Sequence, residues 1–283
     1  MMKIGYKERL KEFEQYLVEE EKSKNTISKY LRDVKKFLEY LEERTLEKRI
    51  VLEFKEYLQK NFEPTSVNSI LAAVNHYLTW DDCMMCRVKP LKIQKAIFEN
   101  PDKELCREEY LRLVSCAKEQ GDDRTALILQ TICSTGIRVS ELEYITVSAI
   151  KSGRSDVKCK GKNRMIYLSK DLCRLLKEYC SKNGIKSGSV FVTKSGKCMD
   201  RSNIWKKMKQ LCKEAKVAQS KVFPHNLRHL FAKSFYEISK DIAKLADLLG
   251  HCNINTTRIY TMESGSNHRK QLDKMNLILP CTT

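Results

Sequence analysis

Three short segments near the carboxy-terminal end carry residues that could act together on an anion. His225 and Arg228 are three apart just after Pro224, whose fixed backbone angle and missing amide hydrogen suit a helix start. They therefore share one face of the first turn, where free backbone amides favour an anion. His251 follows the expected end of a second helix, and Tyr260 lies nine residues further on. Taken singly, His225 fits a capping residue and Tyr260 a packing residue, so only the joint pattern points to chemistry.

That joint pattern resembles the active-site block of the tyrosine recombinases, the phage-integrase and Xer family. The family's block runs His-x-x-Arg-His, then Leu-Gly-His, then a nucleophilic tyrosine nine residues later. This sequence has the same order as His225-Asn-Leu-Arg228-His229, Leu249-Gly250-His251 and Tyr260. The family's first arginine lies upstream in Thr-Gly-x-Arg-x-Ser-Glu-Leu, which is present here as Thr135-Gly-Ile-Arg138-Val-Ser-Glu141-Leu142.

The family's catalytic lysine lies in a β-hairpin a little over twenty residues after that arginine, in a Lys-Gly-x-x-x-Arg setting. The corresponding stretch is Lys160-Gly161-Lys162-Asn163-Arg164, with two residues between the glycine and the arginine. The hairpin is one residue shorter than the commonest Xer-like form, which leaves Lys162 as the alternative. Anchoring the match on the Lys-Gly pair favours Lys160.

The resemblance implies a DNA strand transferase that uses no metal, cofactor or ATP. Tyr260 would attack the phosphodiester and form a 3′-phosphotyrosine, which stores the bond energy for rejoining. Arg138 and Arg228 suit the charge that develops on the phosphate, because planar guanidinium groups bind phosphate bidentately. Lys160 suits the leaving 5′-oxygen, because an ammonium on a hairpin can donate a proton there.

The remaining polar residues of the block have supporting roles in this interpretation. His225 can exchange a proton with the tyrosine hydroxyl, and His251 can donate to a phosphate oxygen. Glu141, one turn after Arg138, would orient that arginine; the alternative is a surface ion pair. His229 is expected to pack rather than react. The carboxylates do not cluster around these histidines, as a two-metal nuclease would require, so we expect no metal site.

Composition points to a polyanionic partner. The 283 residues carry a formal net charge of +17. Residues 1–100 are nearly balanced, with 19 basic and 17 acidic side chains, whereas the remainder has 34 basic and 19 acidic side chains. A basic excess this concentrated favours nucleic acid. No apolar run reaches the length of a membrane span. The twelve cysteines are scattered and no signal peptide is recognisable, which indicates reduced thiols in the cytoplasm. The lone Cys83-x-x-Cys86 pair lacks a second pair for zinc.

Hydrophobic periodicity predicts a mainly α fold with a small β-sheet (α+β), and the linker expected between its two domains would let them close around a duplex as a two-domain clamp. Residues 1–82 form a helical bundle of four helices, and its segment Ser23 to Tyr30 is similar to the DNA-facing second helix of the recombinases' core-binding (SAM-like) domain. A linker follows at 83–103, and residues 104–283 form the catalytic domain. Within that domain the pattern predicts strands at 145–150, 155–159 and 164–168, and helices at about 170–182, 200–216 and 266–279.

The leading functional prediction is a site-specific recombinase that binds double-stranded DNA and exchanges strands through a Holliday junction, for DNA integration, excision or resolution. The resemblance implies a homotetramer on two DNA sites, with a dimer on each, and the apolar helix at 266–279 is expected to dock on a neighbouring protomer. Two alternatives remain: a type IB topoisomerase, which resembles this active site, and a DNA-binding protein with an inactive site.

Overall fold

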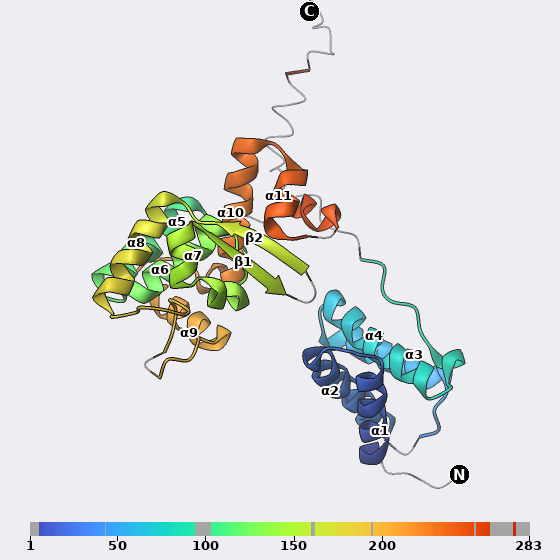
Figure 1. The fold of residues 1–283 in the computed structure, drawn as a ribbon. Coiled ribbons are helices and arrows are strands. Elements are labelled where there is room, and N and C mark those ends of the chain that lie inside the picture. Colours follow the sequence, from blue (N-terminus) through green and yellow to red (C-terminus); the bar gives the residue numbers. More distant parts are fainter. Residues whose placement is uncertain are drawn as a thin grey trace, which may run out of the picture. The chain divides into compact units, whose positions relative to one another are not determined.

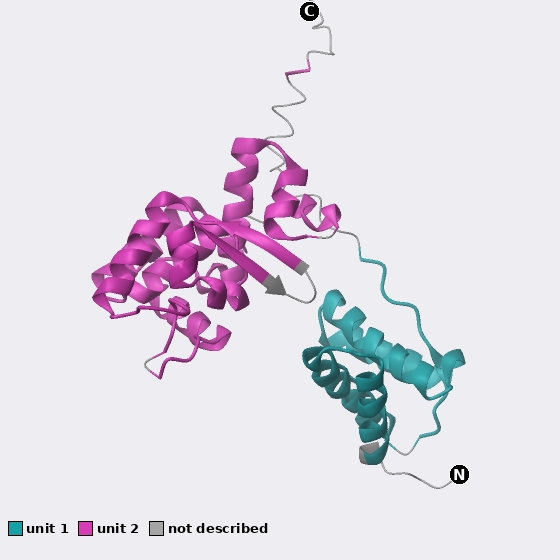
Figure 2. Ribbon diagram, viewed as in Figure 1, with its two compact units in different colours: residues 1–95 teal, residues 96–283 magenta. Residues whose placement is uncertain are grey.

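The structure is a computed structural model that describes residues 6–42, 44–93, 103–159, 162–193, 195–251, 253–260 and 274–275. The chain divides into two compact units, residues 1–95 and 96–283 (Figure 2). Lys160 and most of the predicted helix at 266–279 lie outside the described residues. Within the described ranges, no helix is long and apolar enough to cross a membrane.

The first unit is the predicted bundle of four helices. Each helix turns an apolar stripe inward, and the phenylalanines of three of them meet in one core as Phe13, Phe37 and Phe54. The second helix begins at the predicted cap, where the Ser23 hydroxyl accepts a hydrogen bond from the amide of Thr26 at 3.3 Å. The elements, shown in Figure 1, are α1 (Tyr6–Glu19), α2 (Lys24–Leu41), α3 (Lys48–Asn61), α4 (Pro64–Trp80) and η1 (Met84–Cys86).

Two asparagines on α4 hold the segment that leaves this unit. The Asn75 amide donates to the Val88 carbonyl at 2.8 Å and accepts from the Val88 amide at 3.0 Å. Asn68 brackets Leu91 in the same way, at 2.9 and 2.7 Å. Residues seven apart lie on one helix face, so both asparagines point to the same segment. Each amide side chain donates to and accepts from the backbone of that segment, as the backbone of a neighbouring strand would. The first part of the predicted linker is therefore fixed on α4.

The second unit is a helical domain built around α6, which is apolar and buried on most of its faces. Helices α5, α8, α9 and α10 pack against it, and a two-stranded hairpin lies beside α11 (Figure 1). Its helical elements are α5 (Arg107–Glu119), α6 (Asp123–Thr135), η3 (Val139–Tyr144), α7 (Val147–Ser152), α8 (Lys170–Lys182), α9 (Arg201–Leu211), η4 (Gln219–Lys221), α10 (Pro224–Ser239), α11 (Ile242–Leu249), η5 (Ile254–Thr256) and η6 (Arg258–Tyr260).

The hairpin joins β1 (Arg154–Cys159) and β2 (Lys162–Tyr167) as an antiparallel pair, close to the second and third predicted strands. The first predicted strand, at 145–150, is wrong, because this stretch forms α7. The Thr146 hydroxyl accepts a hydrogen bond from the Ala149 amide at 3.1 Å, and Gly153 ends the helix with a φ of 70°. Local capping at both ends therefore outweighs the strand preference of a segment rich in β-branched residues.

One close approach explains the glycine of the Thr-Gly motif. Gly136 ends α6 with a φ of 65°, and a Cβ atom there would lie 2.3 Å from Cδ1 of Phe231 on α10. Only glycine fits both conditions. The motif therefore brings the end of α6 against α10, where a small apolar cluster of Phe231, Leu249 and Tyr260 also lies.

Candidate active site

Arg138 is held by Glu141 at the turn between α6 and η3. Glu141 Oε1 accepts a hydrogen bond from Arg138 Nη1 at 3.1 Å, and Oε2 accepts one from the Arg138 backbone amide at 2.7 Å. The Glu141 side chain is 2% exposed and that of Arg138 is 43% exposed. Glu141 is therefore not part of a surface ion pair. It anchors one edge of the guanidinium and leaves the rest of this cation accessible to an anion.

Arg228 lies one turn into α10 and is almost completely buried, with 2% of its surface exposed. Nη1 donates to the Gly136 carbonyl at 2.5 Å, and Nη2 donates to the Leu249 carbonyl at 2.7 Å. Burial, followed by the positive charges of Arg138 and Arg164, lowers the pKa of Arg228 to about 10. The side chain is therefore still a cation at neutral pH, and it connects the ends of α6 and α11 through their carbonyl groups.

His251 follows the end of α11 and faces Arg228. Arg228 Nη2 lies 3.0 Å from Nε2 of His251, and Thr257 Oγ1 lies 3.0 Å from Nδ1. Because an arginine can only donate, Nε2 is the acceptor and Nδ1 carries the proton that goes to Thr257. Desolvation and the nearby arginines lower the pKa of His251 to about 4. His251 is therefore a neutral imidazole, and a phosphate anion bound beside it would favour its protonation.

Tyr260 ends the short helix η6 and is only 3% exposed. The ring of His229 lies edge-on to it, with 4.6 Å between centroids, and the ring of His251 lies 6.2 Å away at an interplanar angle of 17°. Burial raises the pKa of Tyr260, while the charge of Arg228 and a hydrogen bond with it act in the opposite direction. The phenol is therefore protonated at neutral pH, and a nucleophilic role requires a group that takes its proton.

Of the two histidines of α10, His229 lies next to the phenol and His225 lies on the other side of His229. His225 is exposed, and its ring centroid is 5.0 Å from that of His229. Desolvation, then the charges of Arg228 and Arg138, lower the pKa of His225, so its imidazole can accept a proton near neutral pH. His229 has a pKa lowered to about 4, mainly by desolvation, and its buried Nδ1 has no hydrogen-bond partner among the described residues. It packs between His225 and Tyr260.

The structure thus brings together six of the seven residues predicted for the site: Arg138, Glu141, His225, Arg228, His251 and Tyr260. The seventh, Lys160, falls outside the described residues. Sequence reasoning gave no role to Arg164, which lies on β2 and forms an ion pair with Glu141. The signal for it was present as the arginine that ends the stretch Lys160-Gly161-Lys162-Asn163-Arg164.

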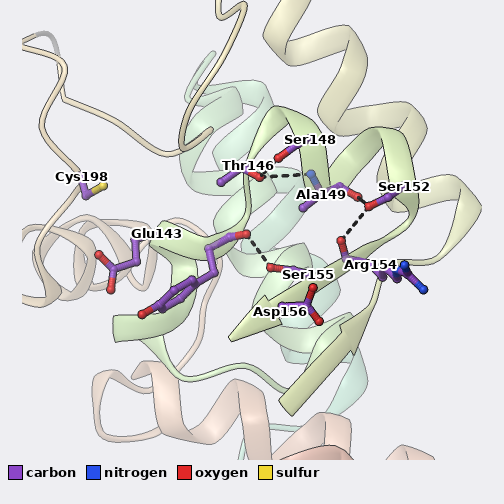
Figure 3. A pocket seen from close by; sticks show the side chains of 10 residues that line it. Glu143, Thr146, Ser148, Ala149, Ser152, Arg154, Ser155, Asp156 and Cys198 are labelled. Atoms are coloured by element: carbon purple, nitrogen blue, oxygen red, sulfur yellow. Dashed lines mark hydrogen bonds between the residues drawn. The ribbon is translucent and has the colours of Figure 1, made fainter. Parts of the chain in front are cut away.

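Within the described ranges, no cluster of three or more histidine, cysteine, aspartate or glutamate side chains could hold a metal ion. A cavity of about 600 Å³ lies over α7 and the start of β1, where Ser155 donates a hydrogen bond to the Tyr144 carbonyl (Figure 3). None of the predicted site residues lines this cavity.

Comparison with known proteins decides the family. Residues 103–266 match the Phage integrase family, and residues 10–81 match the Phage integrase, N-terminal SAM-like domain. The chain belongs to the phage integrase family of tyrosine recombinases. It is 32% identical to tyrosine recombinase XerA of Pyrococcus horikoshii over 279 residues, with 95% of this chain and 94% of that protein covered. It is 31% identical to tyrosine recombinase XerA of Thermococcus kodakarensis, with 95% of each chain covered.

Solved structures agree with this assignment. A crystal structure of XerA recombinase is 26% identical and covers 97% of this recombinase and 100% of its own chain, with a TM-score of 0.53. A lambda integrase (75–356) dimer bound to a COC′ core site is 16% identical and shares the fold, with a TM-score of 0.72 over 89% of this chain and 94% of that one. The predicted family is confirmed, as is the mainly α fold class with a small β-sheet, and this recombinase is an enzyme of site-specific DNA cleavage and rejoining.

Proposed function

We propose that this recombinase cuts double-stranded DNA at a specific site with Tyr260 as the nucleophile. The observation that carries the proposal is the convergence of Arg138, Arg228, His251 and Tyr260 from four separate segments of the chain. Arg228 hydrogen-bonds His251 at 3.0 Å, and the charges of Arg138 and Arg228 both act on the pKa of Tyr260. Two guanidinium groups next to a phenol suit phosphoryl transfer to the phenol without a metal.

In the proposed cleavage step, Tyr260 Oη attacks the scissile phosphorus and the bond from phosphorus to the 5′-oxygen breaks. His225 takes the phenolic proton, and Lys160 gives a proton to the leaving 5′-oxygen. Arg138 and Arg228 bind the non-bridging oxygens, whose charge grows in the transition state. The product is a 3′-phosphotyrosine, and the 5′-hydroxyl of a second duplex attacks it in the reverse reaction, which exchanges the strands.

The contacts of Arg228 indicate how it would meet DNA. Its bonds to the Gly136 and Leu249 carbonyls fix the guanidinium, whereas its hydrogen bond with Tyr260 involves a side chain that can move. Arg228 is 2% exposed and Tyr260 is 3% exposed, so a phosphate can reach Arg228 only after the side chains that cover it shift. The donor that faces Tyr260 would then bind a phosphate oxygen, and the phenol would stand beside the phosphorus.

The assembly is part of the proposal. Solved structures that share this fold include a lambda integrase tetramer bound to a Holliday junction and XerH recombinase bound to difH substrate. Four copies of this chain on two DNA sites, with a dimer on each, would bring two such cleavages together. The reaction would serve integration, excision or resolution of DNA elements in the cytoplasm, through a Holliday junction.

One incubation separates this function from its alternatives. The protein is mixed with labelled DNA that contains its site, either nicked beside the cleavage position or carried on a supercoiled plasmid. A recombinase gives a denaturant-resistant adduct with nicked DNA and exchanged strands when two sites are present. Plasmid relaxation without exchange would indicate the topoisomerase alternative, and DNA binding without any adduct would indicate an inactive site.

A further inference from the structure

Arg164 joins three parts of the active site that are far apart in sequence. It lies on β2, opposite Val157 in the hairpin that holds Lys160, and its side chain is 11% exposed. Nη2 donates to Oε2 of Glu141, and Nη1 donates to the Leu248 carbonyl at 2.6 Å. One planar guanidinium therefore bonds to η3 with one nitrogen and to the last turn of α11 with another.

The carboxylate of Glu141 is shared between two arginines. Its Oε1 accepts from Arg138 Nη1 at 3.1 Å, while Oε2 accepts from the Arg138 backbone amide and from Arg164. With Arg164 in place, Oε2 is occupied by Arg164 and the Arg138 backbone amide, and the Arg138 side chain is held through Oε1 at one nitrogen only. Without Arg164, Oε2 would be free to attract the Arg138 side chain as well, and a two-point ion pair would draw this arginine toward the protein.

The bond to α11 sets the place of His251. The Leu248 carbonyl is one of the last of α11, and a cation there satisfies it and matches the negative end of the helix. A Cβ atom on Gly250, whose φ is 65°, would lie 2.7 Å from Arg164 Cδ. The loop that starts at Gly250 therefore passes directly over the Arg164 side chain before it reaches His251.

We propose that Arg164 is a positioning residue for strand cleavage, because it fixes the hairpin to the carboxylate that holds Arg138 and to the end of the helix that precedes His251. Arg164 itself does not touch the phosphate. This inference rests on the proposed roles of Arg138 and Tyr260, and it assigns to β2 the task of keeping the first arginine free for DNA.

The test measures single-turnover formation of the covalent adduct on a nicked substrate, together with the affinity for one half-site. Arg164→Gln should slow adduct formation by about 10²-fold, the scale of a displacement of about 1 Å in an active site. Its half-site affinity should stay at the parent value. Arg164→Lys should recover little of the rate, because one ammonium cannot bond to Glu141 and Leu248 in the same plane.

Combination with Glu141→Gln distinguishes positioning from a general loss of structure. Because Arg164 acts partly through the shared carboxylate, Arg164→Gln should slow the Glu141→Gln protein by much less than it slows the parent. Arg124→Gln is the matched control, because Arg124 is half-buried in the same unit and donates from Nη1 to the Val192 carbonyl at 2.9 Å. It should keep the parent rate.

Three results would overturn the proposal. The first is an Arg164→Gln protein that forms the adduct at the parent rate, and the second is a double variant whose rate loss equals the product of the two single losses. The third is a rate loss in both Arg164 variants that is explained by weaker binding to the half-site. The proposed function is checked separately in the same assay, since it requires that the parent forms an adduct and that Tyr260→Phe does not.

Discussion

Replacement of Arg228 by methionine should destabilise the catalytic unit as well as stop cleavage. The change keeps much of the side-chain length but removes the donors to the Gly136 and Leu249 carbonyls, which lie 2.5 and 2.7 Å away. A buried polar group left without a partner costs about 1–3 kcal/mol. Relief of the cost of burying the charge offsets part of this loss. We expect a net destabilisation of about 3 kcal/mol.

For a unit of this size, about 3 kcal/mol corresponds to a fall in Tm of roughly 6–12 °C. Arg138→Met is the matched comparison, because Arg138 is 43% exposed and its partner Glu141 keeps its ion pair with Arg164. This variant should lose less than about 1 kcal/mol. Both variants should lose about 10²–10³ in the cleavage rate, as expected when one donor to a developing oxyanion is removed.

The measurement is a thermal melt of the full chain by circular dichroism, with adduct formation followed at a temperature where both variants are folded. The two units can melt separately, so the shift is read on the transition that Arg228→Met affects. An unchanged Tm in Arg228→Met would refute the reasoning, because it would mean that the carbonyl groups of Gly136 and Leu249 do not depend on this arginine.

Three further expectations concern protonation, the leaving group and DNA affinity. His229 and His251 have folded-state pKa values of about 4, below the ordinary 6.5. The free energy of unfolding, measured by denaturant titration, should therefore be constant above pH 6.5 and fall as the pH decreases toward 4. A flat profile would contradict the burial of these two histidines as neutral groups. Lys160→Ala should cleave a substrate with sulfur at the bridging 5′ position nearly as fast as the parent does, because a thiolate leaves without a proton; rescue of Lys162→Ala instead would move the role of proton donor to Lys162. DNA affinity should fall steeply with salt, and the slope of log affinity against log salt concentration should be about −0.9 for each phosphate contact. An affinity that is flat from low to physiological salt would exclude a dominant role for the 34 basic side chains of residues 101–283.

Local signals in the sequence were enough for most of the described helices and for the turn that presents Arg138. Ser23 and Pro224 mark helix starts, and the Thr-Gly motif locates the turn that presents Arg138 because Gly136 must fit against Phe231. Where two local preferences compete, the pattern is ambiguous. The stretch at 145–150 has the composition of a strand, but the side-chain cap by Thr146 makes it a helix.

Long-range contacts could not be predicted from spacing. The sequence assigned Arg228 to phosphate but did not indicate its burial, which depends on carbonyl groups 92 and 21 residues away along the chain. The partners of Arg164 are 23 and 84 residues away, and no periodicity encodes them. The pKa shifts of His229 and His251 arise from the same tertiary packing, since desolvation is the first cause of both.

The central claim is that Tyr260 forms the covalent bond to DNA. The most direct measurement is a denaturing gel of parent and Tyr260→Phe proteins after incubation with nicked, labelled DNA, followed by mass spectrometry of the peptide that carries the nucleotide. The parent should form a stable adduct on Tyr260. The phenylalanine variant lacks one oxygen atom, so it should bind the half-site as the parent does and form no adduct. An adduct in the Tyr260→Phe protein, or a parent adduct on another residue, would contradict the account.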